Sequence, residues 1–159
     1  MLYNNTPKYT QDVDSALLAF SVLRKLGAGN VKTFEERLRS QKIQYLAQVF
    51  SVSPAYNFSL YIHGPYSPGL ANDLFMIEEQ KLKPDLSDFI PDILNERFGR
   101  LSAFIKAKDN RWLELVSTVH LFVKRLGYSE AKSAKELRNW KKASEKEVEE
   151  SFIALKQIP

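Results

Sequence analysis

The segment Tyr61–Leu70 carries the least ordinary local chemistry of the chain, and it reads Tyr-Ile-His-Gly-Pro-Tyr-Ser-Pro-Gly-Leu. Its two glycines and two prolines restrict the backbone, and Ser67 followed by Pro68 is typical of a helix start. Such a loop can present free backbone amides to a ligand or partner. A rigid structural corner is the alternative. The candidate partner-binding residues are Tyr61, His63, Tyr66, Ser67 and Leu70.

Two basic stretches have spacings that place their side chains on one helical face, where they could contact phosphate groups. The candidate nucleic-acid-binding residues are Arg37, Arg39, Lys42, Lys135, Arg138, Lys141 and Lys142. Tyr128 and Trp140 lie near the second stretch and could stack on bases. The alternative is an ordinary solvated helix face.

The residue types that catalysis and metal binding require are sparse. The chain has no cysteine and two histidines, His63 and His120, which lie in different segments. This composition excludes disulfides and thiolate metal sites and leaves no histidine-rich cage. We interpret His63 as a neutral, hydrogen-bonded side chain and His120 as partly buried structure. No P-loop, nucleophile elbow or His-Glu-x-x-His pattern occurs, so we expect no enzyme, no cofactor and no metal site.

The composition indicates a globular protein of ordinary domain size. The 159 residues are 44% hydrophobic and 26% charged, with a net charge of +4 that alternates along the chain from basic to acidic to basic. The polar start, Met1–Asp12, does not resemble a signal peptide, and the apolar run Ala16–Phe20 is too short to span a bilayer. We therefore expect a cytoplasmic protein that does not bind membranes.

Local signals in the first half predict two helices. Residues 1–9 are expected to form a flexible tail, and Thr10 or Asp12 can cap a first helix that runs to about residue 26. Thr33 and Glu36 form a capping box that opens a second helix to about residue 50. The apolar stripes at 34–38 and 43–50 do not continue each other, so a bend near Ser40 is expected.

The rest of the chain predicts a short strand and further helices. Alternating apolar residues at 57–63 favour a strand or extended arm. Helices are predicted at about 68–80, 87–108 (as one or two), 111–126, 129–140 and from 145 onward. The core is expected to contain Tyr45, Phe50, Phe58, Phe75 and Phe122. Residues 10–159 are thus predicted to form one mainly α domain. It would be a compact bundle of six or seven helices with one short extended segment or a small hairpin, and a winged-helix-like element over 34–62 is an alternative.

Two blocks of sequence resemble a known family. The stretch 37–46, Arg-Leu-Arg-Ser-Gln-Lys-Ile-Gln-Tyr-Leu, and the stretch 61–74, with its Gly-Pro-Tyr-Ser-Pro core, resemble the uncharacterised YwgA-like proteins of bacteria and archaea. That family is in turn distantly similar to the Panacea (SocA-type) antitoxin domain. The resemblance to the YwgA-like proteins implies no established catalytic residue, and the likeness to Panacea domains implies a protein partner such as a toxin or a protease adaptor.

The first hypothesis is therefore a non-enzymatic regulatory or protein-interaction module, antitoxin-like in character, that uses the Tyr61–Leu70 corner or an apolar groove beside it. The alternative is a nucleic-acid-binding transcriptional regulator that uses the two basic stretches. A homodimer is compatible with either hypothesis.

Overall fold

The computed structural model describes residues 9–83 and 92–159, and all structural statements below refer to these residues. They form seven α-helices, one π-helical turn and a two-stranded hairpin, and confirm the predicted mainly α fold with a small hairpin. The elements in chain order are α1 (Val13–Lys25), α2 (Phe34–Val49), β1 (Ser59–Tyr61), β2 (Gly64–Tyr66), α3 (Pro68–Glu79), α4 (Asp92–Ile105), α5 (Asn110–His120), η1 (Leu121–Arg125), α6 (Glu130–Trp140) and α7 (Glu145–Gln157).

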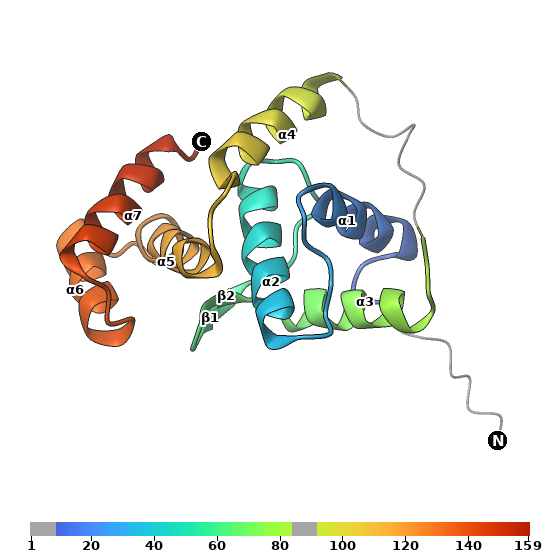
Figure 1. Ribbon diagram of the computed structural model, residues 1–159, viewed down its shortest axis with the longest axis horizontal. Coiled ribbons are helices and arrows are strands. Elements are labelled where there is room, and N and C mark those ends of the chain that lie inside the picture. Colours follow the sequence, from blue (N-terminus) through green and yellow to red (C-terminus); the bar gives the residue numbers. More distant parts are fainter. Residues whose placement is uncertain (1–8, 84–91) are drawn as a thin grey trace.

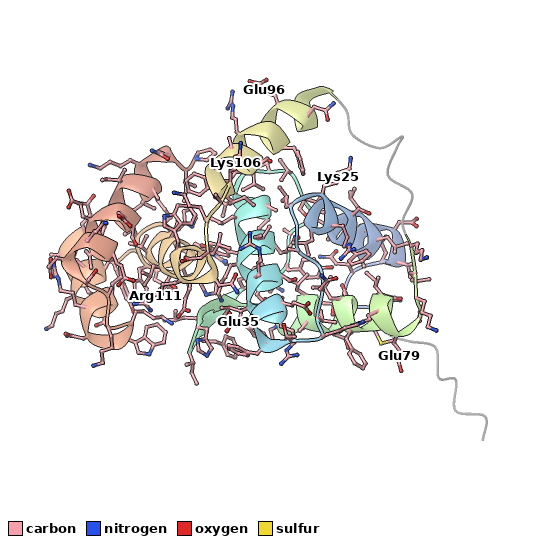
Figure 2. The ribbon with its side chains drawn as sticks, in the orientation of Figure 1. Lys25, Glu35, Glu79, Glu96, Lys106 and Arg111 are labelled. Atoms are coloured by element: carbon pink, nitrogen blue, oxygen red, sulfur yellow. The ribbon has the colours of Figure 1, made fainter. Side chains whose placement is uncertain are left out.

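Helix α2 occupies the middle of the molecule (Figure 1). It contacts α5 on one side and α1 and α3 on the other, while α6 and α7 lie beyond α5. The strands β1 and β2 are antiparallel, with Leu60 opposite Pro65, and β2 contacts both α2 and α5. Charged side chains such as Lys25, Glu79 and Glu96 point outward at the periphery (Figure 2).

The predicted helix starts are confirmed by the capping bonds. Asp12, Ser67 and Ser129 each accept a hydrogen bond from a backbone amide in the first turn of α1, α3 and α6. Thr33 and Ser144 form complete capping boxes with Glu36 and Glu147 at the starts of α2 and α7. These ends were predictable because the capping side chain and the amide that it satisfies are only three residues apart.

The expected bend near Ser40 is wrong, because residues 34–49 form one uninterrupted helix. The two apolar stripes of α2 differ in direction because they face different surroundings. Ile43 and Leu46 are buried in the core, whereas Phe34 is 49% exposed. The pair of helices on which the winged-helix alternative rested is therefore absent from 34–49.

The predicted helix over 111–126 ends differently from the expectation. Regular α-helix stops at His120, and the chain continues as the π-helical turn Leu121–Arg125. Gly127 then adopts a positive φ of 71°, which ends the segment as predicted.

Within the predicted helical region 87–108, α4 covers Asp92–Ile105, and residues 87–91 lie outside the described part of the chain. The same holds for residues 1–8 of the expected tail, while the hydroxyl of Tyr9 donates a hydrogen bond to Gln80.

The core consists of two clusters of buried side chains. The larger surrounds α2 and includes Tyr45 and Leu46, and the smaller joins α5 and η1 to α6 and α7 through Phe122 and Leu137. The predictions for Tyr45, Phe50, Phe58 and Phe122 are confirmed, because each is at most 5% exposed.

Phe75 is the exception, since 58% of it is exposed and the prediction that it lies in the core is wrong. The buried face of α3 follows the helical period through Leu70, Asp73, Leu74 and Ile77, which places Phe75 outside it. Asp73 takes the inward position because its carboxylate accepts hydrogen bonds from the Tyr56 hydroxyl and from the backbone amide of Thr10.

Candidate binding pocket

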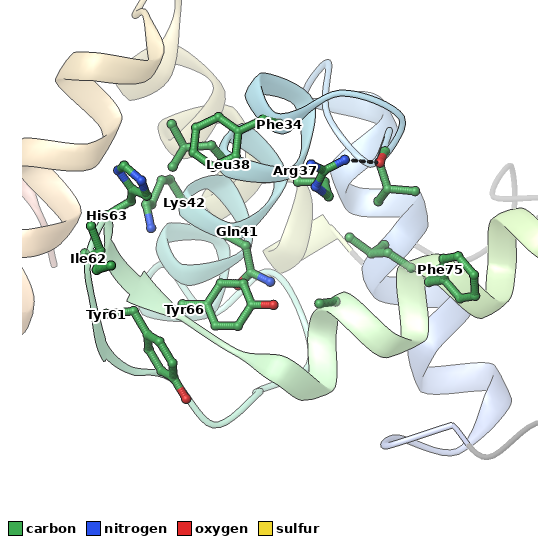
Figure 3. A pocket seen from close by; sticks show the side chains of 14 residues that line it. Phe34, Arg37, Leu38, Gln41, Lys42, Tyr61, Ile62, His63, Tyr66 and Phe75 are labelled. Carbon is green, nitrogen blue, oxygen red and sulfur yellow. Dashed lines mark hydrogen bonds between the residues drawn. The ribbon is translucent and has the colours of Figure 1, made fainter.

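A pocket of about 620 Å³ lies between α2, α3 and the hairpin (Figure 3). We call it the α2–α3 pocket. Its walls are mostly apolar, and its volume lies in the range of sites that hold drug-sized ligands or side chains of a partner. The lining residues are Val31, Phe34, Arg37, Leu38, Gln41, Lys42, Tyr61, Ile62, His63, Gly64, Tyr66, Ala71, Leu74 and Phe75.

Large apolar side chains that the fold leaves in solvent gather around this pocket. Phe34, Tyr61, Ile62 and Phe75 all line it, and they are 49%, 47%, 74% and 58% exposed. Two of these rings each contact another ring of the lining. Phe34 meets His63 edge-on at 5.1 Å between ring centroids, and Tyr61 lies 5.0 Å from Tyr66. The apolar surface is thus continuous from α2 to the hairpin.

Two adjacent side chains of α2 hold the backbone of the hairpin in place. The Gln41 amide accepts a hydrogen bond from the Ser67 N–H at 2.9 Å and donates one to the Ser67 carbonyl at 3.0 Å. Lys42 Nζ donates to the Pro65 carbonyl at 2.6 Å. The two blocks 37–46 and 61–74, on which the family resemblance rests, therefore meet in space.

A second set of side chains holds the tip of the hairpin from the other side. Lys141 Nζ donates to the Ile62 carbonyl and to Glu114 Oε1, the latter at 2.7 Å. His63 Nδ1 lies 3.8 Å from the same Glu114 oxygen. Gly64 adopts a φ of +86°, and its lack of a side chain makes room for the Thr118 hydroxyl of α5. The hairpin is therefore fixed to α2, α5 and the end of α6.

Lys42 is a buried amine, with 1% of the residue exposed. Burial is the main cause that lowers the pKa of Lys42 to about 7. Glu114 opposes the shift, and the nearby Lys141 adds to it. Because Nζ already donates to the Pro65 carbonyl, this lysine acts first as a structural link.

The structure brings three of the five predicted partner-binding residues to the pocket. Tyr61, His63 and Tyr66 line it. Ser67 is buried as the N-cap of α3, and Leu70 is fully buried in the core. The expectation that Ser67 and Leu70 contact a partner is therefore corrected: they build the corner from within.

The first basic stretch does not form the solvated face that nucleic-acid binding required. Arg37 is exposed and lines the pocket. Arg39 donates to the Lys108 carbonyl and to Asn110, and Lys42 is buried. The three basic residues do lie on one helix, as their spacing predicts, but Arg39 and Lys42 are engaged by neighbouring parts of the fold.

The second basic stretch is also partly engaged. Lys141 is 6% exposed and paired with Glu114, and Arg138 pairs with Glu145 at 2.6 Å. Lys135 and Lys142 remain exposed. The aromatic rings proposed for base stacking already have cations above them: Lys141 Nζ lies 4.1 Å from the Trp140 ring centroid, and Lys132 Nζ lies 3.8 Å from that of Tyr128.

Sequence reasoning missed the apolar residues Phe34, Ile62 and Phe75 as surface groups of a site. One signal was available, because the stripe containing Phe34 does not continue the core-facing stripe of α2. No comparable signal marks Phe75.

His120, by contrast, is buried as expected. Its Nδ1 shares a 2.7 Å hydrogen bond with the Tyr45 hydroxyl. Burial, followed by the nearby Lys124 and Arg125, lowers the pKa of His120 to about 4. It is therefore neutral at physiological pH and belongs to the core.

Comparison of the chain with protein-family models, with curated proteins and with solved structures found no match. Within residues 9–83 and 92–159, no three acidic, histidine or cysteine side chains are grouped as a metal site would need. In the same part of the chain, none of the helices combines the length and apolar character required to cross a bilayer.

Proposed function

We propose that this protein is a non-enzymatic protein-interaction module that holds a segment of a partner protein in the α2–α3 pocket. The observation that supports the proposal is the gathering of Phe34, Tyr61, Ile62 and Phe75 around one cavity. Exposed apolar groups that form a contiguous patch are typical of interaction sites, whereas single ones are ordinary.

The way in which the hairpin is held supports the same proposal. A binding surface loses less free energy on association when its residues are already ordered. Lys42 and Lys141 bond to the hairpin backbone, and Gln41 bonds to Ser67 directly after it, so Tyr61 and Ile62 are presented on a fixed frame. The chain resembles the YwgA-like proteins, and the distant similarity of that family to the Panacea antitoxin domain points in the same direction. A toxin or protease adaptor is therefore the class of partner to test first.

The proposal can be tested by selecting displayed random peptides on the immobilised protein. We expect the enriched peptides to bind the wild type and to lose binding to an Ile62→Ser/Phe75→Ser variant. Both side chains are mostly exposed, so the variant should fold. The matched control is Leu126→Ser/Ile153→Ser, which removes two exposed apolar side chains that do not line the pocket. The proposal would be contradicted if both variants lost peptide binding equally, or if neither variant bound the enriched peptides more weakly than the wild type.

The nucleic-acid alternative predicts a different result. A labelled random-sequence duplex should then bind with an affinity that falls steeply with salt, because phosphate contacts release counterions. The nucleic-acid alternative would replace the present proposal if such binding were lost in a Lys135→Glu/Lys142→Glu variant and unchanged in Ile62→Ser/Phe75→Ser.

A further inference from the structure

The α2–α3 pocket has an unbalanced charge. Arg37, Lys42 and His63 line it, and none of its 14 lining residues is acidic. Glu114 lies behind His63, but its carboxylate is already bonded to the buried Lys141 at 2.7 Å. The apolar walls are therefore accompanied by the Arg37 guanidinium, and no lining residue carries a carboxylate that could neutralise its charge.

Arg37 is an exposed basic group of the lining that can meet a ligand. Both of its hydrogen bonds within the described residues are made by Nη1, to the backbone carbonyls of Val31 and Lys32 at 3.1 and 3.2 Å. These two acceptors are uncharged and fix the direction of the guanidinium beside the pocket, as the dashed line in Figure 3 shows for Val31. No residue in 9–83 or 92–159 accepts a hydrogen bond from Nη2 or Nε, and an arginine held in this way is suited to bind a carboxylate through two nitrogens.

Two other polar groups of the pocket are already engaged in hydrogen bonds that hold the fold together. The Gln41 amide is used on both sides by Ser67, and Lys42 Nζ donates to Pro65. A ligand group that enters between Phe34 and Phe75 therefore meets apolar surface, with Arg37 on the same helix as Phe34. An apolar group next to an anion fits this arrangement better than a neutral polar or a cationic group.

We infer that the partner segment carries a carboxylate beside the apolar side chain that fills the α2–α3 pocket, and that Arg37 binds this carboxylate. The inference rests on the proposed function and adds to it the chemistry of the partner. It predicts selection of peptides in which Asp or Glu, or the C-terminal carboxylate, adjoins a large apolar residue.

The test uses two blocked peptides, acetyl-Leu-Phe-Asp-Leu-amide and the same peptide with Asn in place of Asp. Their binding to the 15N-labelled full chain is followed by NMR titration at low salt. We expect the Asp peptide to bind about tenfold more tightly, since hydrogen bonds to an ionised group are the stronger ones. The shifted signals should belong to residues that line the pocket.

Variants of Arg37 make the result specific. Arg37→Gln should remove the preference for Asp while leaving the affinity for the Asn peptide unchanged. Lys135→Gln, which removes an exposed cation outside the pocket, should keep the preference. Equal binding of both peptides to the wild type would overturn the inference and leave the proposed function standing. Failure of both peptides to bind at millimolar concentration would count against both proposals.

Discussion

Lys42 Nζ donates a 2.6 Å hydrogen bond to the carbonyl oxygen of Pro65, 23 residues further along the chain. The bond joins the middle of the central helix to the second strand of the hairpin. It also reverses the interpretation of Lys42 as a phosphate contact, because a side chain that is 1% exposed cannot reach a nucleic acid. Its chemistry is instead that of a buried amine whose pKa is lowered to about 7.

The first prediction concerns the pH dependence that Lys42 confers. Between pH 7 and its usual pKa of 10.5, Lys42 is protonated in the unfolded chain but largely neutral in the folded one. Unfolding then takes up a proton, so this group makes the folded state more stable as pH rises. Chemical denaturation should therefore show that the unfolding free energy of the wild type, minus that of Lys42→Met, increases with pH. The increase should be up to about 1.4 kcal/mol per pH unit.

Groups that titrate in both proteins, such as tyrosines, cancel in this difference. Two profiles that stay parallel from pH 7 to 10.5 would contradict the lowered pKa of Lys42. At pH 7 the Lys42→Met variant should be less stable than the wild type by about 1–3 kcal/mol, because the Pro65 carbonyl is left without its donor.

A second prediction follows from the close approach of Gly64 to α5. A side chain at this position would meet a φ of +86° and collide with the Thr118 hydroxyl. Gly64→Ala should therefore lower the free energy of unfolding by about 3 kcal/mol, from left-handed backbone strain together with overpacking. The matched control is Gly99→Ala in α4, where nothing lies near the added methyl and helix propensity should add about 1 kcal/mol of stability.

A double variant separates the two causes. Adding Thr118→Ala to Gly64→Ala removes the collision but not the backbone strain, so it should restore part of the lost stability. Full restoration would mean that the positive φ costs nothing, and no restoration would mean that Thr118 is not the obstacle.

The helices and their starts were largely predictable because the signals are local. Thr33, Ser129 and Ser144 each bind a backbone amide three residues ahead, so the sequence around each one contains the whole interaction. The corner at residues 61–70 was also predictable, because its backbone restrictions form the turn into α3.

The pocket was not predictable in the same way. Burial of Lys42 depends on Pro65, and burial of Lys141 depends on Glu114, residues that are distant in sequence. Hydropathy likewise could not separate Phe75 from its neighbour Leu74, because both are apolar and only the packing of α3 decides which one faces the core. On α2 the discontinuous stripe at Phe34 is the local trace of the pocket, but a bend in the helix would produce the same pattern.

The third prediction uses that pair of neighbours in α3. Leu74 is 3% exposed and Phe75 is 58% exposed. Leu74→Ala should lower the free energy of unfolding by about 2–5 kcal/mol, because it removes buried methyl groups and leaves a cavity. Phe75→Ser should change it by no more than about 0.5 kcal/mol while weakening peptide binding. A Phe75→Ser variant as unstable as Leu74→Ala would show that Phe75 belongs to the core after all.

The fourth prediction concerns His120, whose Nδ1 shares a hydrogen bond with the Tyr45 hydroxyl in the core. Its pKa is lowered to about 4, first by burial and then by Lys124 and Arg125, whereas in the unfolded chain it has the usual value of 6.5. The unfolded state therefore binds more protons between these two values, and stability falls as pH drops from 6.5 to 4. The loss should reach roughly 3 kcal/mol relative to His120→Gln, which does not titrate in this range. NMR of the imidazole protons gives the direct measurement, and a His120 midpoint near 6.5 in the folded protein would contradict both the burial and the predicted loss of stability.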